Sequence, residues 1–309
     1  MSARPRIHFM AGKGGVGRTT VSAALAVALA REGGRVLLTE MDEATTRAVG
    51  EHPALAATLG LEGGLSPEPR RVLPGVDAAR LCSATGHEAF LRGNLPGGAV
   101  ISAALRSRPV RRFLESGPSF HELGQLAHLA HLAAGQVYTD LVVDLPATGH
   151  ALALVRLPAS LRRIISTGPV ARALDRMSAA MRDPRVTVPW LVTLPETLPV
   201  SETLELAAAL SREGLPTPTL VMNRWPSDPF AHLEGEAAGT QRGLAEAWVR
   251  ASDGVAGSTA LARLSEAHAA LARLPAAWTL RTLPHLPGLE PGALVDALAA
   301  RLTHVRSPA

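Results

Sequence analysis

A glycine-rich segment near the N-terminus constrains the fold of this chain more than any other feature. Residues 12–20 read Gly-Lys-Gly-Gly-Val-Gly-Arg-Thr-Thr. The apolar residues 7–10 before this segment predict a strand, and the alanine- and leucine-rich residues 20–31 after it predict a helix. A second strand is predicted at residues 35–39, directly after two glycines. Strand, loop, helix and strand in this order form a βαβ unit, which indicates an α/β fold built on a parallel sheet.

The spacing within this segment is that of a phosphate-binding loop. It follows the pattern G-x-x-x-x-G, then a basic residue and Thr, where a predicted strand leads into a helix. In that context backbone N–H groups and the helix N-terminus cradle phosphates, and the threonine hydroxyl binds Mg²⁺. The alternative is a glycine-rich connector in an unrelated α/β protein. The nucleotide-binding residues that we predict are Gly12, Gly14, Gly15, Val16, Gly17, Arg18, Thr19 and Thr20, with Thr19 also a Mg²⁺ ligand.

The basic residues of the chain are almost all arginine. Of the 31 Lys and Arg residues, only Lys13 is a lysine. Arg18 stands where a phosphate loop normally has lysine, and a planar guanidinium does not simply replace a compact ammonium group at a tight site. A general replacement of Lys by Arg would explain Arg18. Because Lys13 is retained inside the same loop, we favour the interpretation that an amine is needed at that position.

The rest of the chain continues the alternation of strands and helices. Further strands are predicted at residues 141–144, 189–194, 219–223 and 278–283, of which the first ends in Asp144 and the third in Asn223. Helices are predicted at residues 119–134, 201–212, 260–274 and 291–302, with Ser201 as an N-cap. We therefore expect a doubly wound, mostly parallel sheet flanked by helices, as in P-loop NTPases, in one domain over residues 1–309. Residues of about 60–135 and 158–188 are expected to be loop and helical segments peripheral to the sheet, forming a small helical subdomain.

Composition argues against several other classes of protein. The formal net charge is only +4 over 309 residues, which gives no support for nucleic-acid binding. Cys82 is the single cysteine, so the chain cannot form an internal disulfide or a cysteine-rich zinc site alone. The longest apolar stretch, residues 21–30, has about half the length that spans a bilayer, and the N-terminus lacks a secretory signal pattern. We expect a cytoplasmic protein without an integral membrane segment.

Several motifs resemble one family. The string GKGGVGRTT resembles the deviant Walker A motif of the ParA, MinD, nitrogenase iron protein and ArsA superfamily. The segment Asp-Leu-Pro-Ala-Thr-Gly-His at residues 144–150, followed by Leu-Pro at 157–158, is similar to switch II of the ArsA and Get branch. Residues 194–203, with Glu196 and Glu202, and then Asn223 resemble the stretch that leads to the adenine-contacting asparagine of that family. The similarity extends from about residue 7 to residue 302 and is weakest over about 50–118.

This resemblance implies a set of roles. It implies a dimer that closes over ATP or ADP with Mg²⁺, formed with an identical chain or with a paralogous ATPase. Lys13 would reach the phosphates across the dimer, and Asp42 would be the switch I carboxylate that positions the attacking water. Asp144 would be the switch II carboxylate near Mg²⁺, acting through a water molecule, and Asn223 would contact the base. For Asp42 the alternative is a solvated acid after a strand.

The resemblance favours a cytoplasmic ATP-binding, ATP-hydrolysing, ArsA/Get-like dimer that couples nucleotide state to the binding of a protein partner or client.

Switch I departs from the family, since residues 41–46 read Met-Asp-Glu-Ala-Thr-Thr, and Pro146 and Ala147 of switch II stand in inverted order. Together with Arg18, these departures motivate an alternative, a hydrolysis-impaired regulatory subunit paired with an intact paralogue. A second alternative is a ParA- or MinD-type positioning ATPase, which the Thr-Gly-His of switch II disfavours. The chain also lacks the CxxC that the eukaryotic targeting factors use to share zinc.

Two further groups of residues have simpler interpretations. The histidines of the predicted helix before switch II are interpreted as surface residues, with a metal site as the alternative; they are His121, His128 and His131. A cluster of arginines is interpreted as a solvated loop face, with an anion- or partner-binding patch as the alternative; it comprises Arg106, Arg108, Arg111 and Arg112.

Overall fold

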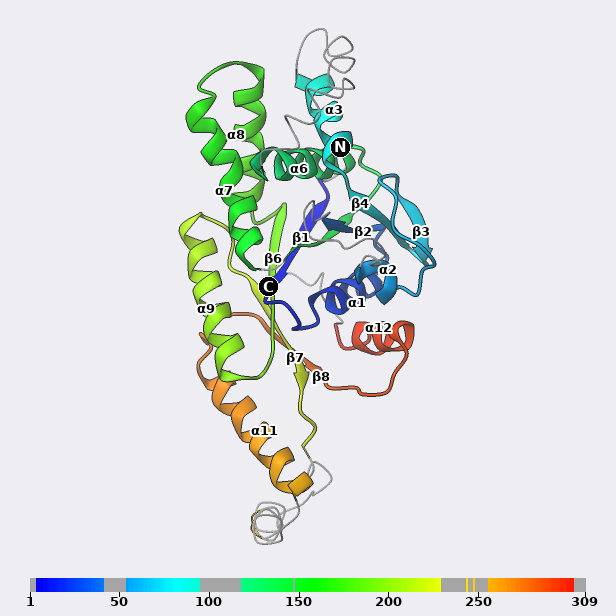
Figure 1. The fold of residues 1–309 in the computed structure, drawn as a ribbon, viewed down its shortest axis with the longest axis vertical. Helices are drawn as coiled ribbons and strands as arrows, with labels where there is room; N and C mark the ends of the chain where they lie inside the picture. Colours follow the sequence, from blue (N-terminus) through cyan, green and yellow to red (C-terminus); the bar gives the residue numbers. More distant parts are fainter. Residues whose placement is uncertain are drawn as a thin grey trace.

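A sheet of eight strands runs through the centre of the chain in the computed structural model (Figure 1). The structure describes residues 4–41, 54–94, 118–146, 148–228, 243, 247 and 255–302. The strand order is β3-β4-β2-β5-β1-β6-β7-β8; β3 pairs with β4 antiparallel, and every other neighbouring pair is parallel. The strands are β1 Arg6–Gly12, β2 Val36–Met41, β3 Arg70–Leu73, β4 Val76–Leu81, β5 Asp140–Asp144, β6 Thr187–Thr193, β7 Thr219–Trp225 and β8 Leu280–Pro284.

Helices cover both faces of this sheet, as the doubly wound prediction requires. Side chains alternate along each strand, so Met10 of β1 joins the core beneath one set of helices while Phe9 joins the other core. Helices α1, α2 and α12 pack on the first core, and α6, α7, α8 and α9 pack on the second. The helices are α1 Arg18–Arg31, α2 Ala54–Thr58, α3 Ser83–Asn94, α6 Pro118–Ala134, α7 Thr148–Ile164, α8 Gly168–Arg182, α9 Thr197–Arg212, α11 Val255–Ala272 and α12 Pro291–Ala299. The predicted mostly parallel α/β fold is confirmed.

The position of β1 determines which loops can form a site. This strand lies between β5 and β6, and its register pairs Met10 with Asp144 and Gly12 with Val192. Because the three strands run parallel, their carboxyl ends meet at one edge of the sheet, where ligands bind in open α/β folds. The loop after Gly12 and the carboxylate of Asp144 are therefore neighbours.

Two predictions about secondary structure are wrong. Residues 70–81 belong to the sheet as β3 and β4, although the sequence predicts peripheral loops and helices there. Half-exposed Asp77 and Arg80 interrupt the apolar pattern of β4, and pairing with the buried strand β2 decides its conformation.

Helix α9 begins at Thr197, one turn before the predicted cap. The Ser201 hydroxyl donates a hydrogen bond to the Thr197 carbonyl within the helix, at 2.9 Å, so Ser201 does not cap it.

The prediction that the three histidines of α6 lie at the surface is wrong for His128. Helix α3 packs on α6 with backbone contacts, since a side chain on Gly86 would collide with the carbonyl of Gly124. His128 lies under this contact and is only 2% exposed, and its Nδ1 accepts a hydrogen bond of 3.0 Å from the backbone N–H of Cys82. His131 is exposed and His121 is half-buried.

Two features are absent from the described part of the chain. It contains no cluster of three or more His, Cys, Asp or Glu residues that could hold a metal ion. None of its helices is long and apolar enough to cross a membrane. The arginine cluster at residues 106–112 lies outside the described residues.

We predict that His128 makes stability depend on pH. Burial, assisted by the nearby His131, lowers the pKa of His128, although Glu68 opposes the shift. The unfolded chain takes up this proton near pH 6.5 while the folded chain resists it, so the stabilising contribution is complete above about pH 6.5 and declines at lower pH. A protonated Nδ1 also cannot accept the Cys82 N–H.

His128→Asn keeps an acceptor near the Nδ1 position and removes the titration. The melting temperature of the wild type, measured relative to that of His128→Asn, should fall between pH 7.5 and pH 5.5. His268→Asn, at an exposed position of α11, serves as the control. A difference between wild type and His128→Asn that stays constant over this range would contradict the prediction.

Candidate nucleotide-binding site

Glycines shape the loop between β1 and α1 at positions where other residues would not fit. Gly15 and Gly17 have φ angles of 83° and 84°, in the left-handed region that residues with a side chain rarely adopt. A Cβ atom on Gly12 would lie 2.5 Å from the carbonyl oxygen of Val192 on the neighbouring strand. The loop can therefore turn tightly at the sheet edge only because glycine occupies these positions.

The loop presents its backbone at the N-terminus of α1. Gly17 is the N-cap residue, and it has no side chain with which to cap the helix. The first N–H groups of a helix have no partner within it, and the helix dipole adds partial positive charge there. Val16 buries its side chain in the core, whereas Gly14 and Gly15 are exposed. This arrangement offers backbone N–H groups to an anion such as a phosphate.

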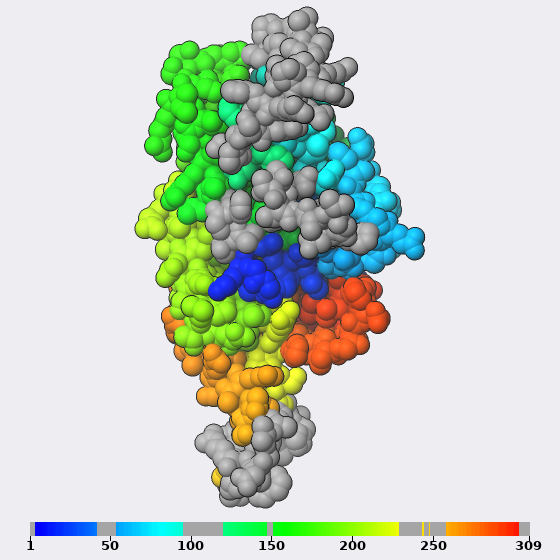
Figure 2. Space-filling view, viewed as in Figure 1, coloured from blue at the N-terminus to red at the C-terminus, as the bar shows by residue number. Residues whose placement is uncertain are grey.

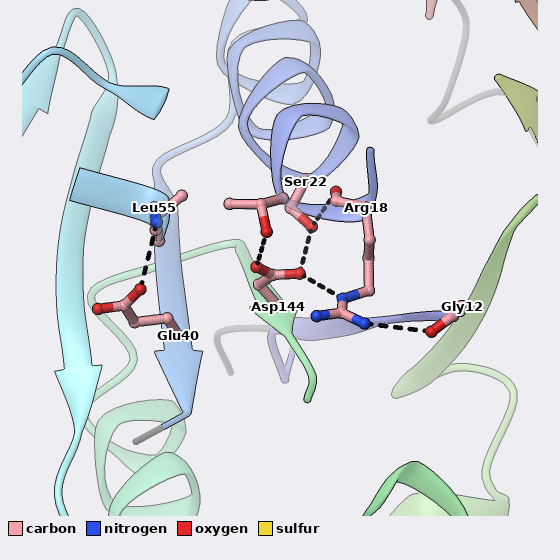
Figure 3. Close-up of polar contacts among 7 residues, drawn as sticks. Gly12, Arg18, Ser22, Glu40, Leu55 and Asp144 are labelled. Atoms are coloured by element: carbon pink, nitrogen blue, oxygen red, sulfur yellow. Dashed lines mark hydrogen bonds and ion pairs between the residues drawn. The ribbon is translucent and has the colours of Figure 1, made fainter. Parts of the chain in front are cut away.

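Three side chains from the start of α1 converge on the carboxylate of Asp144, at the end of β5 (Figure 3). Thr19 Oγ1 donates to Oδ2 at 2.7 Å. Arg18 Nε donates to Oδ1 at 2.9 Å, and Ser22 Oγ donates to the same oxygen at 3.2 Å. Asp144 is 7% exposed, so these donors satisfy a carboxylate that is largely removed from water. The sequence analysis missed Ser22, although its position four residues after Arg18 places both on one helix face.

Arg18 is bound between the ends of β5 and β1. Its guanidinium bridges Asp144 and the Gly12 carbonyl, to which Nη1 donates at 3.1 Å (Figure 3). The side chain is 15% exposed. In this position the arginine neutralises Asp144 and ties the start of α1 to the end of β1.

The donor set beside the loop is suited to Mg²⁺. The ion prefers hard oxygen ligands and keeps several of its water molecules. The Thr19 hydroxyl and the Asp144 carboxylate supply such oxygens 2.7 Å apart. The predicted metal residues therefore fit the ion in chemical type, while Arg18 shares the same carboxylate.

Asn223 binds the backbone of the glycine loop. It lies near the end of β7, is 5% exposed and donates Nδ2 to the carbonyl oxygen of Val16 at 2.8 Å. A side chain on Gly17 would collide with the same amide group. The sequence predicts that Asn223 contacts a base; the structure places it against the loop backbone, and contact with a base stays a prediction.

A hollow of about 320 Å³ opens at the carboxyl ends of β6, β7 and β8, against α11. Arg224 contributes to it from a left-handed conformation with φ 56°. The sequence analysis missed most of this hollow because its walls come from distant parts of the chain. Its lining residues are Leu194, Pro195, Glu196, Arg224, Pro226, Arg263, Glu266 and His285.

The other two predicted catalytic residues are Lys13 and Asp42. Lys13 is exposed, and its Nζ donates to Glu202 Oε1 of the same chain at 2.7 Å. Asp42 directly follows β2 and lies outside the described residues. The described structure therefore brings Gly12–Thr20, Asp144 and Asn223 together, whereas the place of Asp42 stays a prediction.

The chain is similar to known ATPases over parts of its length. The model of the anion-transporting ATPases matches residues 5–48. ATPase BagA of Mycobacterium tuberculosis is 27% identical over 278 residues, which cover 80% of this chain and 76% of that protein. The arsenical pump-driving ATPase of Escherichia coli is 30% identical over 207 residues, which cover 66% of this chain and 32% of that protein.

An uncharacterized protein of Streptomyces coelicolor is 36% identical over 163 residues, which cover 52% of this chain and 39% of that protein. The match to this protein and to the arsenical pump-driving ATPase thus spans well under half of their lengths. In its parallel sheet, its glycine loop at the end of β1 and its relatives, the chain is thus similar to ArsA-like P-loop ATPases.

Proposed function

We propose that the chain binds and hydrolyses ATP with Mg²⁺ in the cytoplasm, and that it forms a dimer in which nucleotide state controls the binding of a protein client. One observation supports this most strongly. The exposed glycine loop at the N-terminus of α1 lies beside a buried Asp144 that already holds the Thr19 hydroxyl at 2.7 Å. Phosphoryl transfer depends mainly on positioning and charge neutralisation, and this arrangement supplies the groups for both.

The residues have separate tasks in this proposal. Backbone N–H groups of residues 14–19 bind the phosphates, and the loop geometry is set in advance by Gly12, Gly17 and Asn223. Thr19 and Asp144 would hold Mg²⁺, which when bound neutralises charge on the phosphate oxygens. Asp42 positions the attacking water, as the family resemblance implies.

The hollow beside α11 is suited to the nucleoside part of the ligand. It lies at the same edge of the sheet as the glycine loop, and its lining combines apolar Leu194 and Pro226 with the charged Arg263 and Glu266. A flat base can lie against apolar walls while polar groups fix its orientation. The loop and the hollow would thus bind the two ends of one ATP or ADP molecule.

A second function is favoured by Arg18. Its guanidinium is bound to the Asp144 carboxylate and to the Gly12 carbonyl, so these contacts must break before it can bind a phosphate. A chain with this contact could bind nucleotide and hydrolyse it poorly. It would then serve as a regulatory subunit in a heterodimer with a paralogue that has an intact loop.

Binding of ATP is predicted to raise the melting temperature. Ligand that binds only the folded state stabilises it by about 2.7 kcal/mol at 100 times its Kd, which corresponds to a shift of several degrees. The shift with ATP and Mg²⁺ should exceed the shift with ATP alone. Thr19→Val should reduce the Mg²⁺-dependent part, and Thr58→Val on α2 is the matched control. The absence of any shift at millimolar nucleotide would exclude the binding function.

Arg18→Lys is predicted to increase ATP turnover at least several-fold. The substitution removes a planar guanidinium and supplies the ammonium point charge that phosphate loops normally use. Phosphate release by the purified chain measures the effect. Arg31→Lys, at the exposed end of the same helix, controls for the change of residue type. Unchanged or lower turnover would show that Arg18 is an adapted part of the site.

Lys13→Gln is predicted to weaken nucleotide-dependent association of subunits. Because the side chain is exposed, the free energy of unfolding should change by less than about 0.5 kcal/mol. Light scattering with and without ATP and Mg²⁺ measures the association. Equal association of wild type and variant would remove the proposed role of Lys13 across the dimer.

A further inference from the structure

The single lysine of the chain has a partner within its own chain. Lys13 Nζ donates to Glu202 Oε1 at 2.7 Å, and the two residues are 189 positions apart in sequence. The side chains are 44% and 35% exposed, so the pair lies at the surface. Figure 2 shows the blue N-terminal segment at the surface beside the yellow-green segment that contains α9. The contact therefore bridges the edge of the glycine loop and the first turns of α9.

Glu202 is the fixed member of this pair. The start of α9 is bound to the residue that follows α11, since Arg273 donates to the Thr197 carbonyl at 3.0 Å and to Ser201 Oγ at 2.9 Å. Val200 packs in a buried cluster with residues of β7 and α11. Lys13, by contrast, lies between two glycines in an exposed loop. A change in the contact would therefore come from movement of Lys13.

Lys13 is the hydrogen-bond donor of the Glu202 carboxylate. The Oε2 atom of this carboxylate is buried and has no hydrogen-bond partner among the described residues. Lys13 is the cation that the described structure provides for this carboxylate, through Oε1. Loss of the hydrogen-bond donor costs free energy when the carboxylate is partly removed from water. The unliganded chain should therefore favour the paired arrangement, and another anion must compete for Lys13.

We propose that Glu202 is a positioning residue that holds Lys13 within its own subunit and thereby sets the nucleotide concentration needed for subunits to pair. The role in pairing rests on the proposed function, in which Lys13 binds the phosphates of the partner's nucleotide. Lys13 must leave Glu202 before it can do so. A triphosphate, which carries more negative charge than a diphosphate, competes better for the ammonium group.

Amine labelling tests the contact in the nucleotide-free protein. An acylating reagent modifies lysine, and Lys13 is the only lysine, so mass spectrometry can follow a single site within residues 7–18, between two arginines. Glu202→Gln and Glu202→Ala should speed labelling of Lys13 by about two- to fivefold, as expected for a part-exposed ion pair. Glu205→Gln, an exposed glutamate on the same helix, should label at the wild-type rate. Equal labelling of wild type and both Glu202 variants overturns the contact.

Light scattering over an ATP titration with Mg²⁺ then tests the role in pairing. Glu202→Gln should associate at a nucleotide concentration about two- to fivefold lower than wild type, while Glu205→Gln should match wild type. If labelling rises in the Glu202 variants but the midpoint of association does not move, the threshold role is overturned and the proposed dimer stands. If no variant associates with nucleotide, the proposed dimer fails and the threshold role fails with it.

Discussion

The carboxylate of Asp144 is the interaction on which the rest of the site depends. It lies at the end of β5 and binds three side chains of α1, so it fixes the first turn of that helix against the sheet edge. The loop is then held at both ends, since Gly12 packs closely on β6 and Asn223 binds the Val16 carbonyl. In the proposed function, a loop held in this way would need little reorganisation to bind a phosphate.

Both basic residues of the loop are bound to carboxylates of the same chain. Arg18 binds Asp144 and Lys13 binds Glu202. The two pairs differ in burial, because the Arg18 side chain is 15% exposed and that of Lys13 is 44% exposed. In the proposed function, a nucleotide would therefore draw Lys13 away more easily than Arg18. In that proposal Arg18 bears on hydrolysis, and Lys13 bears on the association of subunits.

The sequence predicted what depends on local pattern. The strand, glycine loop and helix at the N-terminus and the buried strand that ends in Asp144 all have strong apolar patterns, and they were found where predicted. Where tertiary contacts override the local pattern, predictions from the sequence were wrong. Pairing with β2 makes residues 76–81 a strand despite Asp77 and Arg80, and helix α3 buries His128, which the sequence pattern places at the surface.

By itself, the sequence determined the fold class and predicted a phosphate-binding loop at the edge of the sheet. Glycine, threonine and aspartate are assigned to this loop and its carboxylate because of their own covalent structures and their spacing along the chain. Only the tertiary structure decided the partners of Arg18, Lys13 and Asn223. Asp144, Glu202 and Val16 each lie more than a hundred positions from the residue that they bind. Packing of the strands and helices brings these residues together. Hydrogen bonds act over about 3 Å, so residue pairs of this kind cannot be read from spacing along the chain.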